Sequence, residues 1–268
     1  MPRDELGNGC PILPPERLEE LVRERHERPL PRRFYRQVTV SAERGGFAVL
    51  LDGRPLRTPC KRPFVLPARA LAEAAAAEWR AQGEKIDPAA MPMTGFANAA
   101  IDRAAGPERA VLQAHLAELA EHDLLCYRAG ASQAGLAERQ RQSWDPLLHW
   151  TEEALGARLN LAEGVMPVAQ PRQAVAALMR PCEAADPFAF VALFSMAALT
   201  RSVAIALAVA HGAVSAEDAW TAATLEERWN MELWGEDEQA ARQLAARRDE
   251  FLAAARFLSL CDTNLRKG

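Results

Sequence analysis

The sequence lacks the short motifs that mark the common enzyme classes. It contains no G-x-G-x-x-G, no Walker loop, no G-x-S-x-G and no H-E-x-x-H. A missing motif does not exclude an enzyme, but it lowers the expectation of one. We therefore look first for a protein that binds rather than one that catalyses.

Paired cysteines are also missing. The five cysteines are widely spaced, odd in number and never arranged as C-x-x-C: Cys10, Cys60, Cys126, Cys182 and Cys261. This spacing indicates neither a disulfide framework nor a zinc site, and we expect no metal and no cofactor. The N-terminal residues show no apolar core of a signal peptide, and their acids are too frequent for a transit peptide. A reducing bacterial cytoplasm is the expected location.

There is no excess of positive charge. Lys and Arg total 32 against 36 Asp and Glu, which gives a formal charge of -4 and argues against nucleic acid as a partner. Residues 1–30 are polar and proline-bearing, with one short helical candidate from Glu16 to Arg28. Bases and acids interleave in this segment, which is typical of an arm packed loosely on the body of the protein.

One apolar run, "FAFVALFSMAALTRSVAIALAVA" at 188–210, is long enough to span a bilayer. However, Arg201 lies in its middle, and a central arginine costs about 3 kcal/mol even on the lenient insertion scale. We therefore predict a buried central helix and no stable membrane insertion. Separately, we expect the protein to be a monomer.

Residues 31–129 predict an α+β domain with an antiparallel sheet. "FYRQVTV" and "GFAVLLDGRPLRTP" alternate or run apolar, and Asp52-Gly53 is a strong tight-turn signal. Helices are expected at 68–83, from a cap at Thr94 onward, and at 107–123. "LLCYRA" at 124–129 is expected as a last strand of the same sheet.

Residues 130–268 have helical periodicity throughout and predict an all-α orthogonal helical bundle. Helices are expected at about 133–156, 171–184, 187–211, 215–233 and 236–260, with Pro and Gly at the breaks. The length of 268 residues suits the resulting two domains.

The stretch "LEERWNMELWGEDEQA" at 225–240 combines six acids with two tryptophans. On a helical wheel of about 100° per residue, Trp229 and Leu233 form an apolar stripe and Glu232 points with it. Glu236 does so too if the helix continues past Gly235. If a new helix starts there instead, Glu236, Asp237 and Glu238 occupy its first turn, where acids are favourable. Trp234 points to solvent, and an exposed tryptophan among acids is typical of a binding hot spot.

Four stretches together resemble a known family. "EWRAQGEKIDPAAMPMTGFANAAID" (78–102), "DLLCYRA" (123–129), "SWDPLLHW" (143–150) and "LEERWNMELWGEDEQA" are similar to the assembly chaperones of the F-type ATP synthase alpha subunit, in the expected order. The resemblance runs from about residue 33 to 261. It implies a non-enzymatic protein, a relative of the mitochondrial factor and of alpha-proteobacterial origin, that holds the unassembled alpha subunit until it meets beta.

The resemblance and the wheel together assign two sets of residues. The expected partner-binding residues are Glu232, Trp234, Glu236, Asp237 and Glu238. The expected structural residues are Trp79, Gln82, Pro92, Thr94, Asn98, Asp102 and Trp229. Trp79 also falls on the buried stripe of its own helix.

Two other functions remain open at this point. The first is a metal-dependent hydrolase that uses Glu232 and Glu236 with His115 or His122, since His115, Glu118 and His122 can share a helical face. The true di-metal pattern of Glu-x-x-His on two helices is not present. The second is an interaction protein for another complex, which would share the surface but not the client.

Overall fold

The computed structural model describes residues 30–164 and 166–261. The predicted arm at 1–30, with its helix at Glu16 to Arg28, lies almost wholly outside the described residues. The chain divides into two compact units, with the boundary between Glu108 and Arg109. This boundary precedes the expected one at 129/130 by about one helix.

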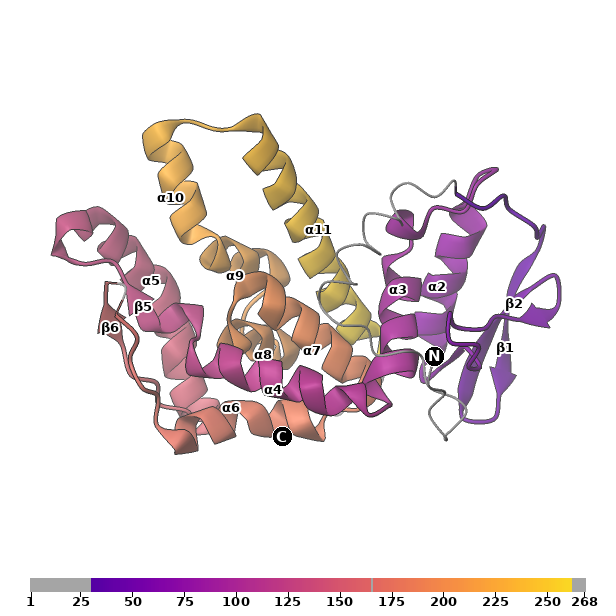
Figure 1. Cartoon of the computed structure of the whole chain (residues 1–268), viewed down its shortest axis with the longest axis horizontal. Coiled ribbons are helices and arrows are strands. Elements are labelled where there is room, and N and C mark those ends of the chain that lie inside the picture. Colours follow the sequence, from indigo (N-terminus) through magenta and orange to yellow (C-terminus); the bar gives the residue numbers. More distant parts are fainter. Residues whose placement is uncertain (1–29, 165, 262–268) are drawn as a thin grey trace, which may run out of the picture. The chain divides into compact units, whose positions relative to one another are not determined.

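The first unit contains a small antiparallel sheet and two helices (Figure 1). Its elements are β1 (Val38–Glu43), β2 (Gly46–Leu51), β3 (Arg54–Pro55), β4 (Val65–Leu66), α2 (Arg69–Ala81) and α3 (Pro92–Ala99), followed by a π-helical turn, Ala100–Ala104. The predicted turn is confirmed, because Asp52 and Gly53 take left-handed φ values of 48° and 78° between β2 and β3.

The core of this unit lies between the sheet and one face of α2. That face consists of Leu71 and the small residues Ala72, Ala75 and Ala76, all fully buried. Small side chains on this face allow the helix axis to approach the strands closely. The first predicted strand starts later than expected, at Val38, because the N–H groups of Arg36 and Gln37 bond to the Asp52 side chain instead of to a strand backbone.

The second unit is helical. It contains α4 (Glu108–Glu121), α5 (Ala134–Trp150), α6 (Arg172–Ala184), α7 (Pro187–Thr200), α8 (Val203–His211), α9 (Ala216–Ala223), α10 (Leu225–Trp234) and α11 (Glu238–Leu260). The described part also has a short parallel pair, β5 (Tyr127–Arg128) with β6 (Ala162–Glu163). The expectation that "LLCYRA" joins the first sheet is therefore wrong.

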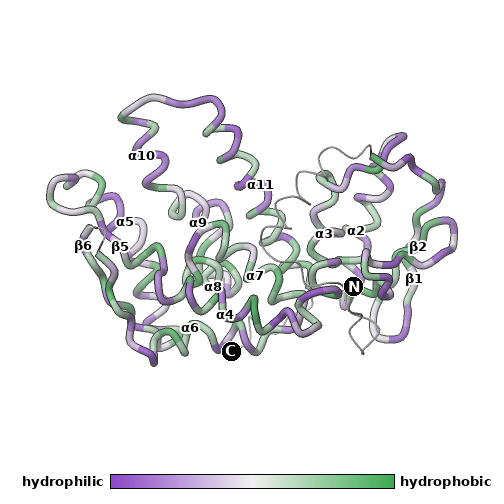
Figure 2. The backbone as a smooth tube through the Cα atoms, viewed as in Figure 1, coloured by the Kyte–Doolittle hydropathy of each residue, from purple (hydrophilic) through white to green (hydrophobic). Residues whose placement is uncertain are grey.

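The long apolar run is not one helix. It breaks at Arg201, which takes a left-handed φ of 54°, and Ser202 then caps α8 by accepting a hydrogen bond from the Ile205 N–H at 3.0 Å. Both halves are the buried centre of the unit, and Figure 2 shows α7 and α8 as largely hydrophobic. No helix among the described residues is long and apolar enough to cross a membrane.

A buried carboxyl holds this break together. Asp123 is fully buried, and its oxygens accept the N–H groups of Leu125 at 3.1 Å and Ala204 at 3.0 Å. Burial raises the pKa of Asp123 to about 6, while the hydrogen bonds act in the opposite direction. The carboxyl thus fixes the first turn of α8 at a cost in desolvation.

We expect titration of Asp123 to make the free energy of unfolding depend on pH. Its folded pKa lies above the unfolded one, so protonation favours the folded state. Relative to Asp123→Asn, the wild type should gain free energy of unfolding as the pH falls through about 6, with the gain complete below about 4. Urea unfolding of both proteins across that range measures the difference; a difference that does not vary with pH would show that Asp123 does not titrate there.

Candidate client-binding surface

The base of α10 is fixed to α5 by buried polar contacts. Gln140 is fully buried; its Nε2 donates to Glu226 at 2.6 Å, and its Oε1 accepts the Ala129 N–H at 2.7 Å. Burial raises the pKa of Glu226, although the Gln140 hydrogen bond and the charge of Arg201 lower it. The prediction that Glu226 is a solvated acid is wrong, because it is desolvated and bonded to Gln140 in a contact that positions α10.

One turn further along, Trp229 packs on α5. Its ring edge lies so close to Gly135 that a Cβ there would come within 2.9 Å of Cη2. The Arg139 guanidinium lies 4.6 Å from the ring centroid, and its Nη1 donates to both carboxylate oxygens of Glu232 at 3.0 and 2.7 Å. Glu232 therefore shares a face with Trp229, as the wheel places it, but it also has an intramolecular partner.

The end of α10 is exposed. Leu233 is 56% exposed and Trp234 is 85% exposed. The outward direction of Trp234 is confirmed, whereas the placement of Leu233 in a buried stripe with Trp229 is wrong. The reason is tertiary: α10 contacts α5 and α9 through its base and contains no buried residue, so no neighbouring helix covers its last turn.

The chain then turns at Gly235, whose φ of 89° ends the helix. Asp237 caps α11 by accepting the Ala240 N–H at 2.8 Å, and Glu238 pairs with Arg242 at 3.5 Å. The prediction that a new helix begins after Gly235 is confirmed, and continuation of α10 to Glu236 is wrong. Glu236 is exposed and has no ion pair with any described residue.

These residues form one exposed apolar and acidic surface at the α10–α11 connection. We call it the tip surface: Leu233, Trp234, Glu236, Asp237 and Glu238. Below it, Arg247 joins α11 to α10 through two hydrogen bonds to Glu227 at 3.1 and 3.0 Å. Arg248 likewise joins α11 to α9 through Glu217. Figure 1 shows α10 and the first half of α11 extending away from α7 and α8 to this connection.

A shallow cavity of about 430 Å³ adjoins Glu232 on the α5 side. It is lined by Arg139, Gln142, Ser143, Thr221, Leu225, Arg228 and Glu232. The cavity lies between α5, α9 and α10, so a side chain of a partner bound near the tip surface would find both charged and apolar groups there.

The residues of the hydrolase alternative are not brought together. His115 lies beside Glu118 and its ring is 5.8 Å from that of Phe194, while the Nδ1 of His122 is 3.1 Å from the Tyr127 hydroxyl. Glu232 is engaged by Arg139 instead. Within 30–164 and 166–261, no group of three or more His, Cys, Asp or Glu residues is arranged to hold a metal ion.

Apart from Trp229 on α10, the expected structural residues lie in the first unit, and several of them surround Glu78. Its carboxylate accepts the Met93 N–H at 2.6 Å, the Thr94 N–H at 2.9 Å and the Thr94 hydroxyl at 2.8 Å. Thr94 therefore does not cap a helix; Met91 is the N-cap of α3 and Pro92 its first residue. Sequence reasoning missed the role of Glu78, because 15 residues separate it from Met93 and no local pattern links the two.

The remaining structural residues join segments within the same unit. Gln82 donates to the Glu78 carbonyl at 3.1 Å and accepts the Asp87 N–H at 2.6 Å. Asp102 accepts the Thr58 hydroxyl at 2.7 Å. Trp79 is only partly buried, with its ring 5.5 Å from that of Tyr35, and Asn98 is half-buried in α3.

Known proteins are similar to this chain in both fold and sequence. The family model described as ATP12 chaperone protein matches residues 32–152. The crystal structure of Atp12 from Paracoccus denitrificans is 41% identical, with a TM-score of 0.81, and the match covers 86% of this chain and 98% of that one. The chain belongs to the ATP12 chaperone family.

Two further relatives agree with this assignment. The Atu1473 protein of Agrobacterium tumefaciens is 46% identical, with a TM-score of 0.82 and 87% of both chains covered. Mitochondrial protein atp12 of Schizosaccharomyces pombe is 24% identical over 247 residues, which is 87% of this chain and 85% of that protein. The expected family of ATP synthase assembly chaperones, and the α+β sheet domain followed by helices, are thereby confirmed.

Proposed function

We propose that this member of the ATP12 family binds the unassembled alpha subunit of the F-type ATP synthase in the cytoplasm and keeps it competent to assemble with beta. In this proposal the protein acts without catalysis, and the tip surface makes the principal contact. The observation that carries the proposal is Trp234, which is 85% exposed between Leu233 and three exposed acids.

A surface of this composition suits a subunit that has not yet met its neighbour. Such a subunit exposes the apolar patch that its neighbour will later cover. In a ring subunit that binds nucleotide, arginines and lysines surround this patch. Tryptophan covers apolar surface efficiently at the centre of an interface. The acids steer the encounter and keep the free chaperone soluble. Binding has to stay modest, because a holder tighter than the alpha–beta contact would block assembly.

The contacts that fix α10 below the tip surface support this function. Gln140, Trp229 and the Arg247–Glu227 pair hold the lower part of α10. The last turn and the connection at Gly235 have no covering element among the described residues. A client can therefore contact Trp234 without first displacing a part of the chaperone.

Glu232 tests the proposal at one residue. Glu232→Lys removes an exposed ion pair with Arg139, which is worth about 0.2–1 kcal/mol, so the thermal transition should move by a few degrees at most. Capture of the alpha subunit should weaken about tenfold, because a base replaces an acid beside the tip surface. Calorimetry and binding to purified alpha subunit measure the two effects.

The matched control is Glu118→Lys, which makes the same charge change at a 75% exposed side chain on α4. It should leave both measurements nearly unchanged. If Glu232→Lys unfolds the protein, Glu232 is structural and the site is misplaced. If tagged wild-type protein from its own host at low salt repeatedly lacks the alpha subunit, the client assignment itself is wrong.

A further inference from the structure

The sheet unit exposes a row of basic and aromatic side chains at its first described segment. From Arg32 to Arg36 the side chains alternate between exposed and more buried, before and up to a bend at Arg36. Arg33 and Tyr35 point inward: Arg33 Nη1 donates to the Gln82 carbonyl at 2.6 Å, and the Tyr35 hydroxyl donates to the Trp79 carbonyl at 2.7 Å. The side chains of Arg32, Phe34 and Arg36 are exposed, and Phe34 is 71% exposed.

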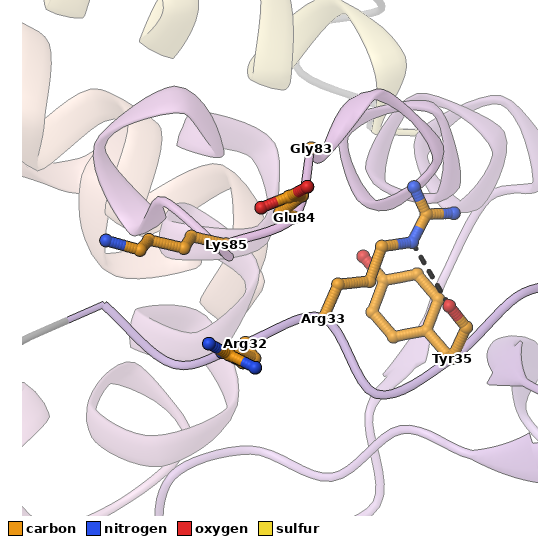
Figure 3. Close-up of a pocket in the computed structure, with 6 residues that line it drawn as sticks. All are labelled: Arg32, Arg33, Tyr35, Gly83, Glu84 and Lys85. Carbon is orange, nitrogen blue, oxygen red and sulfur yellow. Dashed lines mark hydrogen bonds between the residues drawn. The ribbon is translucent and has the colours of Figure 1, made fainter.

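This segment is fixed against a second one. The Arg33 N–H donates to the Glu84 carbonyl and the Ile86 N–H to the Pro31 carbonyl, both at 2.8 Å. A cavity of about 560 Å³ lies here, lined by Arg32, Arg33, Tyr35, Gly83, Glu84 and Lys85 (Figure 3). These hydrogen bonds fix both backbone segments that line the cavity, so the cavity is part of the fold. We call Arg32, Phe34, Arg36 and Lys85 the basic surface.

The positive charge of Arg32 and Lys85 is not neutralised by an ion pair within the described residues. Arg32, Arg36 and Lys85 form no ion pair there, and the hydrogen bonds of Arg33 go to neutral carbonyls. The nearby acids are Glu84 and Asp52. Asp52 accepts the N–H groups of Gln37 and Arg36, and these hydrogen bonds lower its pKa, as do the charges of Arg36 and Arg33. This carboxylate therefore offsets part of the charge of Arg36 and Arg33. Arg32 and Lys85 are therefore the cations that lack a carboxylate partner among the described residues.

We propose that the basic surface binds an acidic segment of the same client, with Phe34 covering an apolar residue of that segment. This inference rests on the proposed function. The complementary charge of the occupant follows from the unpaired cations, and an acidic side chain would enter the cavity between Arg32 and Lys85. The client would then be held at two chemically opposite surfaces on separate units of one chain, and linked contacts raise the effective concentration of the second.

The test is a charge reversal in the full-length protein. Arg32→Glu/Lys85→Glu is compared with Arg44→Glu/Arg69→Glu, which changes the net charge equally at exposed residues of the same unit. Binding to purified alpha subunit should weaken about tenfold for the first pair and less than about twofold for the second. The loss should shrink between about 0.05 M and about 0.5 M salt, because exposed charges are screened.

Phe34→Ala provides a second measurement that does not depend on charge. It should weaken binding severalfold at both salt concentrations without moving the thermal transition, because the ring is exposed. Equal binding by wild type, the Arg32/Lys85 variant and Phe34→Ala would overturn the inference while leaving the tip surface as the contact. If wild type itself fails to bind the alpha subunit, the proposed function and this inference fall together.

Two other partner classes are tested in parallel. Vesicles of phosphatidylcholine with phosphatidylglycerol, and a single-stranded RNA of about 20 nucleotides, probe a membrane surface and a nucleic acid. Binding of either one that is lost in Arg32→Glu/Lys85→Glu, together with unchanged binding of the alpha subunit, would show that the basic surface serves that partner instead. No binding of either by wild type supports the protein client.

Discussion

Trp144→Ala is expected to destabilise the helical unit by about 3–5 kcal/mol. The ring is fully buried, and its Nε1–H donates to the Ala222 carbonyl at 2.8 Å. The Arg128 guanidinium also lies 5.3 Å from the ring. Alanine would leave a cavity and would remove one hydrogen bond to the Ala222 carbonyl near the end of α9, just before α10 begins. Urea unfolding followed by circular dichroism gives the free energy of unfolding.

The matched control for this prediction is Trp234→Ala, the same substitution at a ring that is 85% exposed. It should change the free energy of unfolding by less than about 0.5 kcal/mol. A loss below about 1 kcal/mol for Trp144→Ala would mean that the contact between α5 and α9 is not what holds the base of α10.

The same Trp234→Ala variant is expected to produce the largest loss of client binding. An exposed tryptophan at the centre of an interface commonly contributes 2 kcal/mol or more, so affinity for the alpha subunit should fall about thirtyfold or more. Protection of the alpha subunit from aggregation, followed by light scattering, should be lost in parallel.

Val111→Ala on α4 is the control for binding, because Val111 is 68% exposed and lies away from the α10–α11 connection in the chain. Its affinity should match that of wild type. Wild-type affinity in Trp234→Ala would remove Trp234 from the interface, whatever the fate of the acids beside it.

The sequence predicted the features that depend on local chemistry. The turn at Asp52-Gly53, the end of α10 at Gly235 and the acidic start of α11 at Asp237 follow from φ preferences and capping, which act within a few residues. The outward direction of Trp234 follows from helical periodicity. These signals were sufficient to place the exposed surface.

The features that depend on distant segments were not predictable in the same way. Leu233 shares the wheel position of a core residue, but within 30–164 and 166–261 no segment covers it. Glu232 and its partner Arg139 are 93 residues apart, and Gln140 and Glu226 are 86 apart. Similarly, β5 pairs with β6 rather than with the first sheet. Periodicity gives the direction of a side chain and not the identity of what lies there.

The measurement that tests the central claim most directly is site-specific photo-crosslinking in the native host. A photoreactive phenylalanine analogue is placed at Trp234 in the full-length chain, and a matched one at Val111, both at exposed positions. The account predicts a crosslink to the ATP synthase alpha subunit from position 234 and none from position 111. A crosslink from 234 only to another protein, or to the alpha subunit only from 111, would contradict it.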